Sequence, residues 1–268
     1  MNSGLGDYTS RLKRIESLLT TTRGAAREPL RLLGAVVAYQ ATRFADIISL
    51  PSTLPVDMTT IAAHAARELP VALAVLADDA PPGLAATASS LGRLRPGDAT
   101  QLAATWLEEP ETVDPAAGFW LQASTGPILE RLASDVTAPS EWQTGTCPLC
   151  GAPAQHSLIA EETGEFMGGS PRRLVCGRCA LSWRFPRATC PTCGEDDSSA
   201  IRLFTAVTRQ DARIDVCTTC TSYIKTFDLR RPGGRDLIAP IDDVATLTLD
   251  LWAHQQGFRR SSPSFAGA

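Results

Sequence analysis

The first half of the chain carries apolar residues at helical spacing. Leu33, Val36 and Val37 recur three and four positions apart, which places them on one face of a helix. Asp57 and Asp114 are suited to cap two later helices at their N-termini. We expect helices at residues 8–20, 29–48, 57–69, 71–77, 84–94, 98–110 and 114–132.

Three features of this half bear on where its helices end. Residues 71–77 form an apolar run that fits either a buried helix or a strand, and their alanines and helical neighbours favour a helix. Pro70 is expected to end the helix before it, and Pro127 to kink or divide the last one. The pattern therefore predicts an all-α domain at residues 26–140, preceded by an extension at 1–25.

The periodicity changes after a polar, turn-rich segment at residues 134–145. A last amphipathic helix, capped by Asp242 and ended near Gly257, and a disordered tail at 261–268 close the chain. The acidic segment at 161–170 predicts an exposed loop. Short strands are predicted between these segments at 155–159, 173–175, 181–185, 201–204, 213–216 and 223–227.

All eight cysteines belong to Cys-x-x-Cys pairs within the strand-rich segment. Two thiolates separated by two residues can face one cation if the backbone turns tightly, and two such turns complete a tetrahedral four-sulfur site. Eight thiols thus predict two closed metal sites with no open position for a substrate. The pairs are Cys147/Cys150, Cys176/Cys179, Cys190/Cys193 and Cys217/Cys220.

The four pairs alternate between two kinds of turn. The first and third have the pattern C-P-x-C-G, in which proline presets φ and glycine accepts a positive φ after the second ligand. The second and fourth lack it. This repeat favours sequential pairing, the first pair with the second and the third with the fourth, over a cross-braced arrangement. Four tandem disulfides are the other alternative.

The predicted fold class is therefore α+β. The helical domain is followed by a first four-cysteine ribbon at 141–188, a second at 189–235, and a C-terminal helix and tail at 236–268. Each ribbon is too small to bury a core of its own, so we expect metal to supply its stability.

Composition limits the function classes. The chain has 268 residues, 44% of them hydrophobic, and a formal net charge of −4, which argues against non-specific nucleic-acid binding. No secretory signal and no apolar run long enough to span a bilayer are apparent. Paired thiols then indicate a reducing, cytoplasmic setting. No catalytic triad, phosphate loop or dinucleotide motif is visible, so we expect no enzymatic activity.

Five arginines surround the second cysteine pair. They form a solvated face, offset the negative charge of a four-thiolate site, or provide a docking patch for an acidic partner or a phosphate-bearing ligand. They are Arg172, Arg173, Arg178, Arg184 and Arg187. Of the histidines, His156 lies near enough to the first pair to replace a cysteine ligand, but eight thiols already suffice.

Taken together, these motifs resemble the formate dehydrogenase accessory protein (FdhE) family. The resemblance rests on CPLCG at 147–151, RRLVCGRCALSW at 172–183, CPTCG at 190–194, CTTCTSYIK at 217–225 and DDVATLTLDLWAHQQGF at 242–258. It covers residues 147–258 clearly and the helical half more weakly. Ala180 and Thr221, which follow the second and fourth pairs, depart from it; at Thr221 the family commonly has glycine.

The resemblance implies a cytoplasmic maturation factor. Such proteins are thought to bind the catalytic subunit of a respiratory, molybdenum- or tungsten-containing formate dehydrogenase before it is exported by the twin-arginine route. It also implies that the ribbons are rubredoxin-like, with the eight cysteines as ligands of two ions, iron or zinc. A nucleic-acid-binding zinc ribbon and an iron–thiolate electron-transfer protein are the alternatives. The sequence leaves the metal, the bound segment of the partner and a homo-oligomeric state open.

Overall fold

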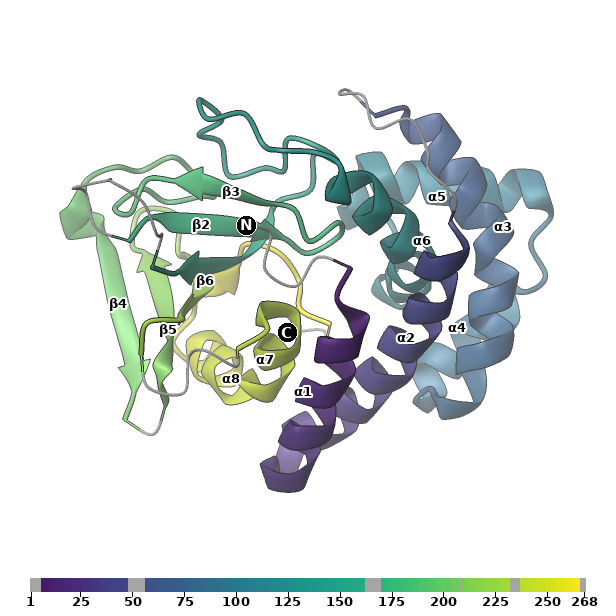
Figure 1. The fold of residues 1–268 in the computed structure, drawn as a ribbon, viewed down its shortest axis with the longest axis horizontal. Helices are drawn as coiled ribbons and strands as arrows, with labels where there is room; N and C mark the ends of the chain where they lie inside the picture. The colour runs from purple at the N-terminus through teal and green to yellow at the C-terminus, as the bar shows by residue number, and fades with distance from the viewer. Residues whose placement is uncertain (1–5, 48–55, 162–169, 208, 232–236, 266–268) are drawn as a thin grey trace.

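The computed structural model describes residues 6–47, 56–161, 170–207, 209–231 and 237–265. Its N-terminal half is helical, as predicted, and forms one side of the molecule (Figure 1). The predicted loop at 161–170 and the end of the second predicted helix, at Ile48, fall largely outside the described residues. The helices are α1 (Tyr8–Thr21), α2 (Arg27–Asp46), α3 (Met58–Leu76), α4 (Pro82–Leu91), α5 (Pro96–Glu108) and α6 (Pro115–Ser134).

Local sequence signals set the N-termini of these helices. The Asp57 side chain accepts a hydrogen bond from the Thr59 amide, and Asp114 accepts from the amides of Ala116 and Ala117. These carboxylates satisfy amides that have no partner within the helix. The predicted caps at Asp57 and Asp114 are therefore confirmed.

Two prolines lie inside helices. The expectation that Pro70 ends its helix is wrong, because α3 continues through it, and α6 likewise continues through Pro127. Leu69 and Leu73 on either side of Pro70 are buried in the helical core. A proline inside a helix costs about 3 kcal/mol or more, and burial of several apolar side chains on both sides offsets that cost.

Helix α3 is the central apolar helix of this half. Within the described part of the chain, Met58–Asp79 is the one helical stretch long and apolar enough to cross a membrane by length and composition, and 44% of its apolar 18-residue window is buried. Ile61, Ala65 and Leu69 lie in the same core as Trp106 of α5 and Trp120 of α6. The stretch is thus packed as a core helix.

The C-terminal half contains the two predicted cysteine modules, whose strands form one mixed sheet, so the predicted α+β class is confirmed. The strands are β1 (Ala154–Ile159), β2 (Arg172–Cys176), β3 (Ser182–Phe185), β4 (Ile201–Ala206), β5 (Arg209–Cys217), β6 (Ser222–Asp228) and β7 (Arg259–Arg260). Their order is β3-β2-β1-β6-β5-β4, and β7 pairs with β6. Each cysteine module supplies three antiparallel strands, and parallel pairing of β1 with β6 joins the modules edge to edge.

The last predicted helix is two short helices, α7 (Ala239–Ala245) and α8 (Leu247–Gln255), which lie between the sheet and α1 (Figure 1). Asp242 is not the N-cap, because it lies inside α7. Its carboxylate accepts a hydrogen bond from the Ile238 amide at 2.8 Å. It also accepts two from the Arg14 guanidinium, at 2.6 and 3.0 Å.

A buried network of charges fastens these helices to the sheet. The ammonium of Lys225 on β6 lies 2.8 Å from a carboxylate oxygen of Asp243 and 2.6 Å from one of Asp250. The Arg260 guanidinium binds the same two carboxylates at 2.6 and 2.9 Å. Two cations and two anions balance here, which makes burial of all four side chains tolerable.

The chain end is also part of the fold, and the predicted disorder from residue 261 is wrong as far as Phe265. The Ser261 amide donates to the Tyr223 carbonyl, and the Pro263 carbonyl accepts from Gln155. The ring of Phe265 lies 5.3 Å from that of Phe119 on α6. The tail therefore crosses from the sheet to the helical domain.

Candidate metal centres

The eight sulfurs form two groups of four, each within 4.8 Å of one another. Their membership is that of sequential pairing: Cys147, Cys150, Cys176 and Cys179 in the first site, and Cys190, Cys193, Cys217 and Cys220 in the second. All eight are free thiols. The cross-braced and disulfide alternatives therefore do not describe this structure.

The spacing of the sulfurs fits a tetrahedral metal ion. Ligands about 2.3 Å from a central ion lie about 3.8 Å from one another. Cys147 and Cys179 lie 3.5 Å apart, Cys150 and Cys176 3.4 Å, and Cys150 and Cys179 3.9 Å. In the second site the distances are 3.7 Å for Cys190–Cys220 and 3.8 Å for Cys193–Cys217. Each group can hold one thiophilic cation such as zinc or iron.

The turns that carry the cysteines share one backbone form. Gly151 and Gly194 follow the first and third pairs with φ of 70° and 77°. Ala180 and Thr221 occupy the same place after the second and fourth pairs with φ of 57°, although they carry a Cβ atom. Ala180 and Thr221, which depart from the family pattern, therefore keep the turn geometry. Their Cβ atoms make that left-handed backbone conformation energetically unfavourable.

Backbone amides in these turns point at the sulfurs. The Arg178 amide lies 3.4 Å from the Cys176 sulfur, and the Thr192 amide lies 3.4 Å from that of Cys190. Such donors stabilise thiolate charge. Burial tends to raise the pKa of Cys190, but the amides of Cys193 and Thr192 and the Ser222 hydroxyl together lower it to about 7.

The first site lies inside the core that joins the two halves of the molecule. Its four cysteines are at most 5% exposed and belong to the same apolar cluster as Trp106, Trp120 and Leu121 of the helical domain. Helix α6 reaches the turn directly, because the Gln122 side-chain amide lies 3.2 Å from the Gly177 carbonyl. This site therefore forms a joint, that is, a contact between the helical domain and the sheet, and also cross-links the turns of one module.

Arg178 is the side chain that completes this joint. Its guanidinium donates to the carbonyls of Leu107 and Trp106, both at 2.9 Å, and lies 4.3 Å from the Trp106 ring centroid. These carbonyls are at the C-terminal end of α5, where unpaired acceptors and the helix dipole favour a cation.

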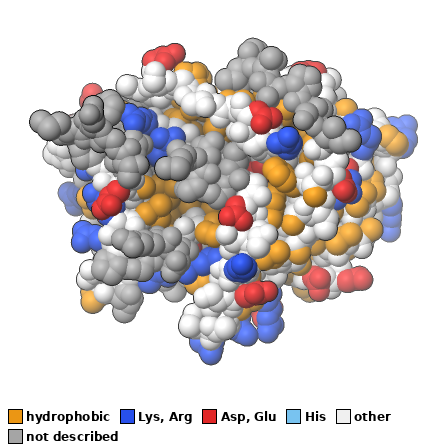
Figure 2. Space-filling model, in the orientation of Figure 1, with side chains coloured by type: hydrophobic (Ala, Val, Ile, Leu, Met, Phe, Trp, Pro, Cys, Tyr) orange, Lys and Arg blue, Asp and Glu red, His pale blue; other side chains and the backbone are white. Residues whose placement is uncertain are grey.

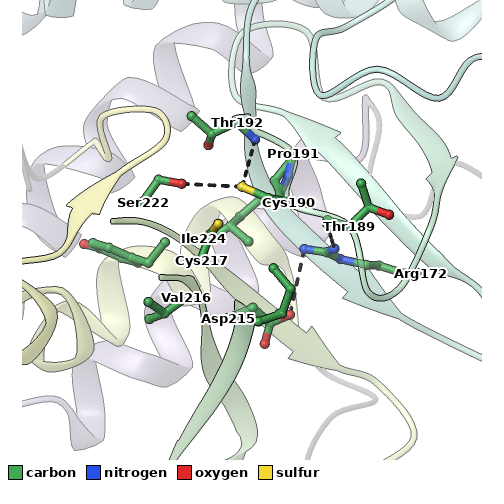
Figure 3. A pocket seen from close by; sticks show the side chains of 12 residues that line it. Arg172, Thr189, Cys190, Pro191, Thr192, Asp215, Val216, Cys217, Ser222 and Ile224 are labelled. Atoms are coloured by element: carbon green, nitrogen blue, oxygen red, sulfur yellow. Dashed lines mark hydrogen bonds and ion pairs between the residues drawn. The ribbon is translucent and has the colours of Figure 1, made fainter. Parts of the chain in front are cut away.

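The second site lies at the surface. Cys190 and Cys217 are buried, but Cys220 is partly exposed and Cys193 is exposed. The Ser222 hydroxyl lies 2.9 Å from the Cys220 sulfur and 3.6 Å from that of Cys190. Figure 3 shows Ser222 and Thr192 beside the Cys190 sulfur, at a pocket of about 240 Å3 including open solvent at its mouth.

The predicted arginine cluster does not form one exposed patch. Arg172 and Arg178 are 3% and 8% exposed. Arg172 donates to the Ser157 hydroxyl and the Thr189 carbonyl and lies 3.8 Å from an Asp215 oxygen, so it links the two modules (Figure 3). Arg184 and Arg187 are exposed and Arg173 is partly so; a docking role for these three stays a prediction.

His156 does not belong to either four-sulfur group. It is fully buried on β1, and its Nδ1 atom lies 3.7 Å from Asp243. Burial lowers its pKa to about 3, more than the nearby Asp243 carboxylate can offset, so the imidazole is neutral.

Sequence reasoning missed the residues that tie the sites to their surroundings. Gln122, Ser222 and Lys225 are ordinary polar residues in sequence, and the partners of Gln122 and Lys225 lie far along the chain. The contact of Ser222 with the sulfurs could have been predicted from sequence, because a hydroxyl two residues after a ligand cysteine can reach the sulfur.

The arrangement can be compared with known proteins. The family described as FdhE, C-terminal domain, matches residues 188–266, which contain the second site and helices α7 and α8. A "Protein FdhE homolog" from Aquifex aeolicus is 34% identical over 151 residues, 56% of this chain and 51% of the relative. One from Pseudomonas aeruginosa is 29% identical over 211 residues, 73% of this chain and 65% of the relative. The chain thus spans about half to two thirds of the length of these two relatives.

One solved structure aligns with nearly the whole chain, including the helical half. The crystal structure of the FdhE protein from Pseudomonas aeruginosa aligns with a TM-score of 0.73 at 21% identity, over 99% of this chain and 96% of that one. At this identity the likeness establishes the fold, including the helical half. The match of residues 188–266 to the family model and the similarity to curated relatives support the resemblance to the FdhE family that the sequence predicted, and the solved structure supports the fold.

Proposed function

We propose that this protein is a cytoplasmic accessory factor that binds the catalytic subunit of a respiratory formate dehydrogenase, a molybdenum or tungsten enzyme, before that subunit is exported by the twin-arginine route. The observation that carries the proposal is the match of residues 188–266 to the FdhE C-terminal domain. That segment contains a four-cysteine site, partly open to solvent at Cys193 and Cys220, at one end of the mixed sheet. The chain acts by binding and performs no catalytic step.

Two metal ions, zinc or iron, hold the binding surface together. The first ion fixes the sheet to the helices, and the second fixes the turns at the far end of the sheet. Four thiolates close each ion against substrate, which supports a role other than hydrolysis or ligand activation.

The partner is proposed to contact the β2–β3 side of the sheet. Exposed Arg184 and Arg187, with partly exposed Arg173, supply positive charge there for an acidic segment. Acidic and basic side chains are otherwise interspersed over the face in Figure 2, without a broad basic field of the kind nucleic acid requires.

The test is binding of purified, metal-loaded chain to the purified dehydrogenase catalytic subunit, measured by calorimetry at several salt concentrations. We expect a saturable complex that weakens with salt. The double variant Arg184→Glu/Arg187→Glu should weaken it about tenfold or more. Arg93→Glu/Arg95→Glu, on exposed positions of the helical half, is the matched control and should leave binding unchanged. Absence of any complex with the wild-type chain would refute the proposal.

A further inference from the structure

The two four-cysteine sites differ at one repeated position. Two residues after the last cysteine of its group, the first site has Leu181 and the second has Ser222. Leu181 is 0% exposed and belongs to the core around the first site. Ser222 is also buried, at 7%, but its hydroxyl faces two ligand sulfurs. The buried apolar side chain of Leu181 beside the first site thus corresponds to a hydroxyl in contact with the sulfurs of the second site.

The surroundings of the first site prevent an incoming molecule from reaching its sulfurs. The four cysteines are buried among Leu181, Trp183 and the helical core. Gln122 and Arg178 fasten the second turn to α6 and α5. Access to a metal ion here requires separating the sheet from the helices, an opening close to global unfolding.

The surroundings of the second site allow such access. Cys193 is exposed, and so are its neighbours Thr192 and Gly194 and the turn residue Thr219. Thr219 donates to the Glu195 carboxylate at 2.8 Å, which joins the two turns across their exposed side. Thr218 in the same turn also donates from its amide and its hydroxyl to the Ala200 carbonyl. The Thr219 hydrogen bond between the two turns lies at the surface, where water competes for it, so it contributes little. A small opening of these turns would expose two sulfurs.

We propose that the first site is a permanent structural staple and the second is an exchangeable metal site, with Ser222 slowing release of its ion. This inference rests on the proposal that both sites hold a thiophilic cation and not on the identity of the protein partner. It assigns the exposed end of the sheet as the place where an ion can be delivered, withdrawn or contacted by another molecule.

Exchange at the second site needs no redox chemistry. With an ion bound, Cys193 and Cys220 would be the more accessible of its four ligands, and thiolates freed from it would be protonated by solvent. With an ion bound, the Ser222 hydroxyl donates to the Cys220 thiolate, because that sulfur then carries no proton. The hydrogen bond stabilises the turn in its ligated form and opposes the first step of release.

The experiment uses the full chain loaded anaerobically with two equivalents of Zn2+ and treated with an excess of a colorimetric chelator. We expect one zinc per chain to be released at least about tenfold faster than the other, since one site opens locally and the other opens only with the domain joint. Release of both ions at one rate would overturn the proposal. A chain that retains no zinc would also overturn it, and would further remove the metal-binding part of the proposed function.

Alkylation identifies the fast site without any substitution. Iodoacetamide is added when the fast phase is complete, and peptides are analysed by mass spectrometry. We expect label on Cys190, Cys193, Cys217 and Cys220 and protection of the first four cysteines. Equal labelling of both groups, or earlier labelling of the first, would contradict the assignment.

Ser222→Ala tests the role of the hydroxyl. The fast phase should accelerate about threefold or more, in proportion to the lost hydrogen bond to a charged sulfur, and the slow phase should not change. Ser198→Ala, an exposed serine in the same module, is the matched control and should alter neither phase. An unchanged fast phase in Ser222→Ala would remove Ser222 from the mechanism.

Discussion

Ala180 and Thr221 hold the left-handed backbone conformation that glycine holds in the other two turns. For a residue with a Cβ atom this conformation costs about 1–2 kcal/mol. Replacement of either by glycine should therefore stabilise the folded chain by up to about 1 kcal/mol, after subtraction of the extra freedom that glycine gives the unfolded chain. Denaturant unfolding of zinc-saturated protein measures the change.

Gly151→Ala and Gly194→Ala are the matched reverse substitutions. An added Cβ meets no other atom within 4 Å at either position, so steric overlap does not confuse the result. Both should destabilise the chain by about 1 kcal/mol. Equal stability of all four variants and the wild type would show that backbone strain in these turns is negligible.

His156 makes the stability of the chain depend on pH. Its pKa is lowered by burial to about 3 in the folded state, against about 6.5 for an unfolded chain. As pH falls below about 6.5, the unfolded state binds a proton and the folded state does not, so stability decreases. Above pH 6.5 the neutral imidazole leaves the stability of the folded chain undiminished. Between pH 7.5 and 5.5 the free energy of unfolding falls by about 1.4 kcal/mol.

Two chemically different replacements test this prediction. His156→Leu and His156→Gln should both flatten the dependence of unfolding free energy on pH in that interval, whatever their stability at neutral pH. Part of any remaining slope belongs to His64, whose pKa burial also lowers. If both variants keep the full wild-type slope, His156 is protonated in the folded chain or has an ordinary pKa there.

At the scale of single residues, sequence predicted the grouping of the cysteines but not the burial of two of the five arginines. The grouping of the cysteines follows from spacing, because a turn of fixed length brings each pair together. The environment of Arg172 and Arg178 depends on contacts with residues distant in sequence, such as Asp215 and Trp106. Nothing in the local pattern distinguishes them from exposed Arg184.

Among the secondary-structure elements, the contact between α5 and the second cysteine turn depends on Arg178. Arg178→Lys keeps the charge but replaces the planar guanidinium, whose two terminal nitrogens reach the Leu107 and Trp106 carbonyls separately, with a shorter side chain and a compact ammonium that cannot stack in the same way on the Trp106 ring. We expect a loss of about 2 kcal/mol in unfolding free energy. We also expect faster hydrogen exchange in the last turn of α5, because its carbonyls lose their partner.

Arg202→Lys on the exposed face of β4 is the control for this substitution and should change stability by less than about 0.5 kcal/mol. Equal exchange rates of α5 amides in Arg178→Lys and wild type would mean that the turn and the helix are joined by apolar packing alone.

Sequence predicted the existence of the elements better than their ends and connections. All six strands in the cysteine modules were expected because each is a short segment that contains β-branched or aromatic residues and is bounded by turns. Pro70 misled because its cost was weighed locally, although Leu69 and Leu73 bury enough surface to carry α3 through it. The parallel pairing of β1 with β6 has no local signature, since it depends on how two complete modules meet.

For the whole molecule, the C-terminal tail joins three parts of the fold. It pairs with β6 through β7, places the Arg260 guanidinium on Asp243 and Asp250, and packs Phe265 near Phe119. The short strand and the single tail phenylalanine carry too weak a pattern to be expected from sequence. The role of Arg260 could not be predicted from sequence either, because its two acidic partners become neighbours only once α7 and α8 pack on the sheet.

Arg260→Gln tests whether this network holds the assembly together. Its removal leaves Lys225 facing both Asp243 and Asp250 in a buried site with a net negative charge, and we expect a loss of about 3 kcal/mol or more in unfolding free energy. Arg259→Gln, on the adjacent exposed residue of the same strand, should cost less than about 0.5 kcal/mol. Because α7 also packs against α1 and α2, hydrogen exchange in Arg260→Gln should quicken in α7 and α1 as well as in β6. Exchange that quickens only in β7 would instead show that the Arg260 network does not hold the sheet and the helical domain together.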